Sequence, residues 1–165
     1  MYTFLKDKLL DEQGQEIMMD WETDLMQEHA KVITETNINT HTIIEIHDQI
    51  FDRLLEWAKD KPNVIPIKGD WFDSIPKNKK YDGIMHDTWE EKNWPCFLPN
   101  IESSLNKRGI ATWYNADVPE VFKHNCSNLK WGNLTYKTIK VNPPIKKMKY
   151  QYYDKNIYYI PKLVL

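Results

Sequence analysis

The stretch KVITETNINTHTIIEIHDQIF, Lys31 to Phe51, contains the pattern that decides the fold. A β-branched strand is predicted at Thr42–Ile46, with an acid, Glu45, at its end, and Asp48 is the expected N-cap of the amphipathic helix that follows. A carboxylate at this point of a strand is how a nucleotide-binding sheet meets a ribose. The glycine turn that belongs before such a strand is missing, so the pattern indicates either half of a cofactor site or a strand that never bound a cofactor.

Strand and helix patterns alternate along the rest of the chain. Apolar side chains recur at helical spacing between Glu22 and Ile33, and again after Asp48. Further predicted elements are strands at 64–67, 83–87 and 108–114, helices at 97–105 with Pro99 near the first turn and at 119–124, and strands within 134–141 and 156–165. The alternation predicts an α/β fold with an open, mostly parallel sheet and an antiparallel edge.

One domain is expected over residues 1–165, because the chain is long enough for one core and short for two. We divide it into an N-terminal segment at 1–21, βα units at 22–126 and antiparallel strands at 133–165.

The charge and cysteine content exclude several classes of function. The 22 basic and 24 acidic side chains nearly cancel, which does not favour a nucleic acid partner. Neither the five histidines nor the two cysteines have metal-ligand spacing, so no metal is predicted. No apolar run approaches the ~18 residues of a membrane span. We therefore expect a cytoplasmic protein without a membrane anchor; the aromatic tail leaves a homo-oligomer open.

Polar side chains fall at the carboxyl ends of the predicted strands, where ligands of open α/β sheets bind. They are Glu45; the run Gly69, Asp70 and Trp71; Asp87; and Asn115. Each also has an ordinary explanation as a loop or cap residue. Two acids, Glu22 before the first helix and Asp87, would hold a planar cation such as a guanidinium if the fold brings them to one cleft.

Five segments in order carry a family resemblance: MMDWETDLM (18–26), IIEIHDQIFDRLLEWA (43–58), VIPIKGDWFD (64–73), YDGIMHDTW (81–89) and YYIPKLV (158–164). Together they resemble guanidinoacetate methyltransferase and the related arginine delta-N-methyltransferases, which are class I S-adenosylmethionine-dependent enzymes. The likeness runs from about Gln15 to the C-terminus. It implies a Rossmann-like fold and N-methylation of a guanidino group on a small molecule or an arginine side chain.

The resemblance also implies roles for individual residues. Glu45 would accept the ribose hydroxyls of S-adenosylmethionine, Gly69, Asp70 and Trp71 would border its adenine, and Met19 would lie near its sulfonium. Glu22 and Asp87 would bind the guanidino group, with one of them taking a proton. Asn115, Ala116 and Asp117 would face the far end of the substrate.

The chain lacks the unit that the family places before the strand at 42–46, namely a first strand, a glycine-rich turn and a helix. Only seven residues, Glu35 to His41, separate Thr34 from that strand, whereas a parallel crossover needs about a dozen or more. No two of the five glycines are closer than fourteen positions, so no other segment supplies the turn.

Three interpretations of the missing unit stay open: residues of the protein that this sequence does not contain, a shortened enzyme that still binds cofactor weakly, or a methyltransferase-like fold kept as a non-catalytic binding module. In each case the centre of the sheet is affected. The strand at 42–46 must pair directly with the strand at 83–87, or a partner chain must fill the space between them.

Overall fold

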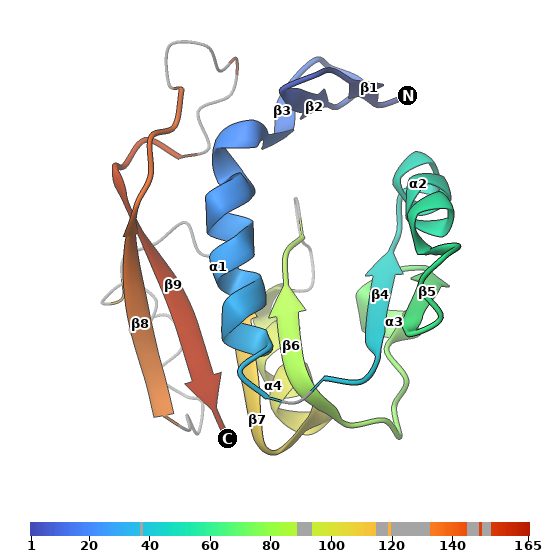
Figure 1. The fold of residues 1–165 in the computed structure, drawn as a ribbon, viewed down its shortest axis with the longest axis vertical. Coiled ribbons are helices and arrows are strands. Elements are labelled where there is room, and N and C mark those ends of the chain that lie inside the picture. The colour runs from blue at the N-terminus through green and yellow to red at the C-terminus, as the bar shows by residue number, and fades with distance from the viewer. Residues whose placement is uncertain (37, 89–93, 115–118, 120–132, 145–148, 150–152) are drawn as a thin grey trace.

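The computed structural model describes residues 1–36, 38–88, 94–114, 119, 133–144, 149 and 153–165. Helices and strands alternate through the middle of the chain, and the chain ends in strands, as the sequence patterns predict (Figure 1). The elements are β1 (Thr3–Phe4), β2 (Lys8–Leu10), β3 (Glu16–Met19), the 3-10 turn η1 (Asp20–Glu22), α1 (Thr23–Ile33), β4 (His41–Glu45), α2 (Asp48–Ala58), β5 (Val64–Lys68), α3 (Trp71–Ser74), β6 (Tyr81–His86), α4 (Trp94–Ser104), β7 (Leu105–Trp113), β8 (Asn133–Lys140) and β9 (Ile157–Val164).

The largest sheet has four strands in the order β6-β7-β9-β8. β6 and β7 run parallel, whereas β9 is antiparallel to both of its neighbours. The β8–β9 pairing is continuous from Asn133 opposite Val164 to Lys140 opposite Ile157. This confirms the predicted class, an α/β sheet with parallel strands first and an antiparallel C-terminal edge.

Helices cover both faces of this sheet, and each face has its own apolar core. The strand alternation of β7 separates them, because Ile110 belongs to the core that includes Leu25 and Val32 of α1, whereas Ala111 and Trp113 belong to the core that includes residues of α4. Five successive residues of β7, 109–113, are buried. β7 is therefore an interior strand with both faces covered, as expected for the parallel part of such a sheet.

A separate two-stranded sheet holds β4 and β5, paired in parallel from His41 opposite Val64 to Glu45 opposite Lys68. β4 does not pair with β6 within the described residues, so the first of the two alternatives for these strands, direct pairing, is wrong. The last turn of α1 lies against β6 at Gly83, where an added Cβ would approach the Ile33 carbonyl oxygen to 2.6 Å. From there the chain carries β4 away from β6, and the backbone of β4 bonds to β5 instead.

Several local predictions need correction. His47, not Asp48, is the N-cap residue of α2; Asp48 is the first helical residue and forms an ion pair with Lys68 at 2.7 Å. The helix predicted at 97–105 begins at Trp94, so Pro99 lies inside it. Residues 120–124 of the helix predicted at 119–124 lie outside the described residues.

The segment at 1–21, for which we predicted no strands, forms a three-stranded antiparallel sheet, β1-β2-β3. Gly14, at a φ of 73°, lies in the turn between β2 and β3, where the Asp11 side chain accepts hydrogen bonds from Gln13 and Gln15. No helix in the described ranges is long and apolar enough to cross a membrane.

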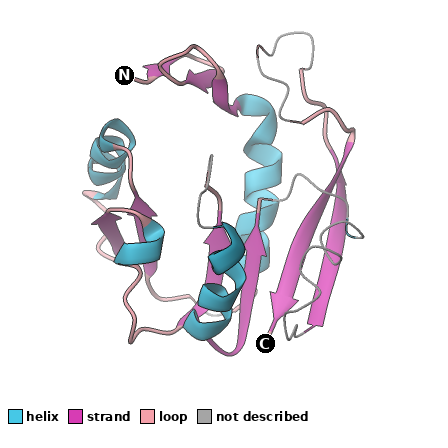
Figure 2. Cartoon of the chain, turned by 180° about the vertical axis from the view of Figure 1, so that it is seen from behind, coloured by secondary structure: helices cyan, strands magenta, loops and turns pink. Residues whose placement is uncertain are grey.

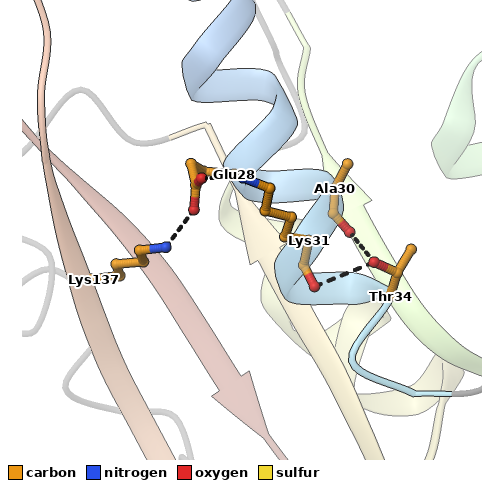
Figure 3. A network of polar contacts seen from close by, with 5 residues as sticks. All are labelled: Glu28, Ala30, Lys31, Thr34 and Lys137. Atoms are coloured by element: carbon orange, nitrogen blue, oxygen red, sulfur yellow. Dashed lines mark hydrogen bonds and ion pairs between the residues drawn. The ribbon is translucent and has the colours of Figure 1, made fainter.

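An ion pair connects α1 to β8 (Figure 3). Glu28 pairs with Lys31 one turn later at 2.6 Å and, through its other oxygen, with Lys137 of β8. At the end of α1, the Thr34 hydroxyl donates to the Ala30 carbonyl at 2.8 Å. The ammonium groups of Lys137 and Lys31 lower the pKa of Glu28 to about 2. Glu28 thus links the helix to the edge strand electrostatically.

Replacement of Glu28 by Gln is expected to lower the free energy of unfolding at pH 7 and low salt. Because the folded-state pKa lies below the ordinary value of 4.5, the contribution of Glu28 is present above pH 4.5 and is lost as the pH falls toward about 2. Urea unfolding at pH 7 and pH 2.5 measures this difference. Glu56→Gln is the matched control, because its pair with Lys59 lies within α2 and links no two elements. An equal effect of both substitutions would contradict the proposed link.

Candidate functional site

A pocket of about 180 Å³ lies between the separated strands β4 and β6. One wall is formed by residues of β4, including Thr42 and Ile44, and the opposite wall by Tyr81 and Gly83–His86 of β6. Ile33 of α1 and Ile101 of α4 also line it. Figure 2 shows α4 on the opposite side of the β6–β7 pair from α1. The pocket therefore lies between two strands that do not pair with each other, and its rim lies at the carboxyl end of β6.

Asp87 follows the last residue of β6 and lines this rim. Its side chain is exposed at the surface, yet the surrounding walls remove enough water to raise the pKa of the carboxyl group to about 6. The carboxylate is therefore still ionised at neutral pH, although less favourably than a fully hydrated carboxylate. Such a group favours a cationic ligand, which would supply the missing counter-charge.

Trp71, the first residue of α3, lines the same pocket as Asp87. The contact that holds it there is with His86, whose ring is 8% exposed and packs edge-on against Trp71 at 5.0 Å between ring centres and 82° between planes. His86 Nε2 also lies 3.2 Å from the Thr88 hydroxyl oxygen. The indole and the carboxylate, which the sequence predicted to serve cofactor and substrate, thus line the same pocket.

The sequence interpretation missed the part that His86 plays. Next to Asp87 it looked like an ordinary strand-end residue, and its spacing to other histidines gave no metal motif. The only available signal was the strand period, which gives His86 the opposite direction from Asp87. Its partner Trp71 is fifteen positions away in another element, so their contact could not be read from the sequence.

Glu45 ends β4 beside the turn that follows β5. One carboxylate oxygen accepts a hydrogen bond from the His47 backbone N–H at 2.6 Å, and the Glu45 carbonyl accepts one from the Gly69 N–H at 3.0 Å. Within the described part of the chain the second carboxylate oxygen has no hydrogen-bond partner. The side chain is therefore oriented by its own backbone and keeps one oxygen for a ligand.

The Asp70 side chain stabilises this turn. Its side chain caps α3 by accepting a hydrogen bond from the Phe72 N–H at 2.9 Å. Gly69 before it has a φ of 148°, and an added Cβ would lie 2.1 Å from the Ser74 hydroxyl oxygen. The turn between β5 and α3 therefore requires glycine, and it fixes the start of the short helix that carries Trp71.

Substitution Gly69→Ala is expected to destabilise the protein by about 1–3 kcal/mol, the usual cost of overpacking a tight site. The double variant Gly69→Ala/Ser74→Ala should recover part of this loss, because it removes the hydroxyl and leaves only the Ser74 Cβ at 3.3 Å. Thermal unfolding of the two variants and of Ser74→Ala alone measures the recovery. If Ser74→Ala restores nothing, the backbone conformation rather than the clash determines the cost.

Met19 and Glu22 lie at the start of α1, toward the same end of the molecule as the carboxyl ends of β4 and β6 (Figure 1). Both are buried, at 6% and 7% exposure, and Glu22 accepts a hydrogen bond from the Met19 N–H at 2.8 Å. Neither is among the described residues that line the pocket of Asp87. The paired-carboxylate site therefore stays a prediction, with Glu22 engaged in closing its own turn.

The other predicted substrate residues, Asn115, Ala116 and Asp117, lie outside the described residues. A search of the described side chains finds no group of three or more His, Cys, Asp or Glu that could hold a metal ion.

The residues fit one half of S-adenosylmethionine better than the other. The open carboxylate oxygen of Glu45 and the indole of Trp71 suit a ribose diol and an adenine ring, respectively. For the methionine half the family uses a glycine-rich turn, and no two glycines of this sequence are close enough to form one. The described residues thus include side chains suited to the ribose and the adenine, whereas the sequence has no glycine-rich turn suited to the methionine half.

Solved structures with the same architecture are methyltransferases. The tRNA (m1A58) methyltransferase TrmI from Aquifex aeolicus matches with a TM-score of 0.57 at 13% identity, over 94% of this chain and 72% of that chain. M. jannaschii TYW2, in complex with AdoMet, matches with a TM-score of 0.56 at 16% identity, over 99% of this chain and 84% of that one. The chain therefore has a Rossmann-like class I methyltransferase fold.

The sequence comparison identifies the family within that class. Residues 26–115, more than half of the chain, match the family guanidinoacetate N-methyltransferase, and the chain belongs to this family. The resemblance drawn from the sequence is thereby confirmed.

Among curated relatives, protein arginine N-methyltransferase 2 of Candida glabrata is 27% identical over 213 residues, covering 97% of this chain and 50% of the relative. The protein of the same name from Aspergillus oryzae is 30% identical over 144 residues, covering 68% and 35%. The chain thus spans half the length of the first relative and about a third of the second.

Proposed function

We propose that this chain is an S-adenosylmethionine-dependent N-methyltransferase that acts on a guanidino group, carried by a small molecule or by an arginine side chain. Its family and the names of its relatives support this reaction class. The observation that carries the proposal is the Asp87 carboxylate, with its raised pKa, at the rim of a pocket beside Trp71. We include a cytoplasmic location in the proposal, on the basis of the sequence composition.

Asp87 is proposed to orient and deprotonate the acceptor. A guanidinium stays protonated up to a pKa above about 12 and has no free lone pair, so a base must hold one of its N–H groups. S-adenosylmethionine, when bound, supplies a methyl group on a sulfonium and leaves as a neutral thioether. As the N–C bond forms and the S–C bond breaks, the acceptor nitrogen loses its proton to the Asp87 carboxylate.

The remaining predicted residues take positioning roles in this proposal. Glu22 would supply the second carboxylate of the guanidinium site, and Asn115, Ala116 and Asp117 would bind the far end of the substrate. Glu45, Gly69, Asp70 and Trp71 would hold the adenosine, with Met19 near the sulfonium. Holding both reactants in line can lower the activation barrier by about 7–11 kcal/mol, so binding geometry would account for much of the rate enhancement.

Calorimetric titration with S-adenosylmethionine tests the cofactor half of the proposal. Glu45→Gln is expected to weaken binding by about ten- to hundredfold, the loss of a hydrogen bond to a charged group. Asp48→Asn is the matched control, because this exposed acid lies three positions further along and pairs with Lys68. Binding that is insensitive to Glu45→Gln would contradict the assigned site.

Transfer of labelled methyl groups to guanidinoacetate and to an arginine-containing peptide tests the reaction and its acceptor. The proposal expects incorporation into one of the two. If cofactor binds and neither acceptor is methylated, the alternative of a non-catalytic binding module replaces the proposal.

A further inference from the structure

Two strand edges face each other across the pocket, and we call the space between them the β4–β6 gap. Among the described residues, the backbone of β4 pairs only with β5, and the backbone of β6 pairs only with β7. Both strands line the same pocket, and their arrows point the same way (Figure 1). A row of free backbone donors and acceptors is a template for another strand. Here two such rows with the same direction stand on either side of one space.

The backbone groups that face the gap can be assigned from the ladders. The His41 N–H donates to the Asn63 carbonyl at 2.8 Å, so His41 faces β5, and Thr42 and Ile44 face the gap. The His86 carbonyl accepts from the Tyr114 N–H at 2.9 Å, so His86 and Ile84 face β7, and Gly83 and Met85 face the gap. All four gap-facing residues line the pocket.

The two edges of the β4–β5 sheet differ in how readily they could pair with another strand. In β5 the outward-facing positions alternate with those bonded to β4, and Pro66 occupies an outward position, where it removes an N–H. The gap-facing edge of β4 contains no proline. None of the five residues of β4 is buried, although three are β-branched, in contrast to residues 109–113 of β7. β4 therefore has the composition of an interior strand and the exposure of an edge.

The lining defines the chemistry of what would fit. Ile33 closes the gap from the side of α1, and Trp71 and Ile101 close it from α3 and α4. A strand in the gap would be covered on both faces, which calls for a continuous run of apolar residues rather than an alternating one. At the amino end of the gap the Lys79 ammonium reaches to 3.4 Å from the Thr42 hydroxyl oxygen, a contact between side chains that an entering strand would displace.

We propose that the β4–β6 gap accepts one extended, apolar strand of about five residues from a different protein, not from a second copy of this chain, and that this strand runs parallel to β4 and β6. No strand of the described residues fills the gap, and the link from Thr34 to His41 is too short for a strand and its crossover. The alignment with the Candida glabrata relative runs over 213 positions for a chain of 165 residues, so at least 48 positions of the relative, the difference, have no counterpart here. This proposal does not depend on methyl transfer.

A soluble peptide with the central segment Val-Ile-Val-Ile-Val between lysine flanks tests the proposal. Binding is measured by calorimetry on the full chain, and hydrogen exchange is followed residue by residue. Saturable binding is expected, with new protection of the Thr42, Ile44, Gly83 and Met85 amides. The same peptide with proline in place of its central Val should not bind.

The variant Ile44→Pro separates the gap from other binding surfaces. It removes a gap-facing N–H and leaves the bonds of β4 to β5, a position where edge strands tolerate proline. Peptide affinity should fall about tenfold, the effect of one lost hydrogen bond, while urea unfolding verifies the fold. Unchanged affinity, or binding without protection at the four amides, overturns the proposal. Protection of these amides without peptide in a dimer would assign the gap to a second copy and overturn it as well.

Discussion

Replacement of Asp87 by Asn is expected to reduce methyl transfer to a guanidino acceptor by about 100- to 10,000-fold, the usual contribution of a general base. The amide keeps the size of the carboxylate but can neither hold the proton released by the acceptor nor balance its positive charge. Turnover of the purified variant at pH 8 with saturating acceptor measures the loss. Equal turnover of both proteins would remove Asp87 from the proposed mechanism.

The pH dependence distinguishes this role from a structural one. Loss of water from its surroundings raises the pKa of Asp87 to about 6, so wild-type activity should fall as the pH drops through about 6. The stability effect has the opposite sign. A folded-state pKa above the ordinary 3.8 means that the ionised group destabilises the fold above about pH 6. Asp87→Asn should therefore unfold at the same or a higher urea concentration at pH 8.

Asp82→Asn is the matched control for this experiment. Asp82 lies on β6, the strand that Asp87 follows; it is exposed, and it accepts a hydrogen bond from the Asn106 side chain at 2.7 Å, outside the pocket. Its substitution is expected to leave turnover within about twofold of wild type. A similar loss in both variants would point to general damage to β6 rather than to a base at its end.

The strands of this fold could be predicted because their residues carry the information locally. THTIIEI, VIPIK and YDGIMH are short, β-branched or apolar runs between turn residues, and β4, β5 and β6 begin and end within two residues of the predicted limits. The order of the strands across the sheet, unlike their positions in the sequence, cannot be predicted from local residues. It depends on contacts between residues far apart in sequence, and so the sequence left open whether β4 pairs directly with β6 or a space remains between them.

Short elements and caps were the weaker predictions. α3 has only four residues, too few for a helical stripe, and its start depends on the φ of Gly69 and the cap by Asp70. The cap of α2 was predicted one residue late because Asp48 is the better capping type, whereas its side chain turns to Lys68 instead. A competing charge partner in the next strand decides this, and sequence spacing does not reveal it.

The candidate site was predictable to the extent that it follows from strand ends. Asp87, Glu45 and the Gly69–Trp71 turn all fall where parallel strands stop, and the structure brings Asp87 and Trp71 to one pocket. The pairing of Glu22 with Asp87 was proposed from the chemistry of two acids and is also implied by the family resemblance, but it depends on a long-range contact that no local pattern shows. In the structure the Glu22 carboxylate caps its own turn, a use that its position three residues after Met19 permits.

Acidification from pH 6.5 to pH 4 is expected to destabilise the protein through His29, by on the order of 3 kcal/mol. His29 of α1 is fully buried; its Nδ1 lies 2.7 Å from the Thr112 hydroxyl oxygen of β7, and its ring packs edge-on against Tyr158 of β9. Its Nε2 has no hydrogen-bond partner in the described part of the chain. Burial lowers the pKa of the imidazole to about 4, so the unfolded state takes up a proton first as the pH falls.

The double variant His29→Leu/Thr112→Val should remove this dependence, because replacing both hydrogen-bond partners with apolar groups can leave the core nearly neutral in energy. Asp87 acts against His29 in the same pH range, since acidification through about pH 6 relieves its charge. Both proteins are therefore compared in the Asp87→Asn background by urea unfolding at pH 8, 6 and 5. If the double variant still loses stability as the pH falls, another group causes the acid sensitivity. If its stability does not change with pH, protonation of the buried His29 imidazole, which contacts β7 and β9, causes it.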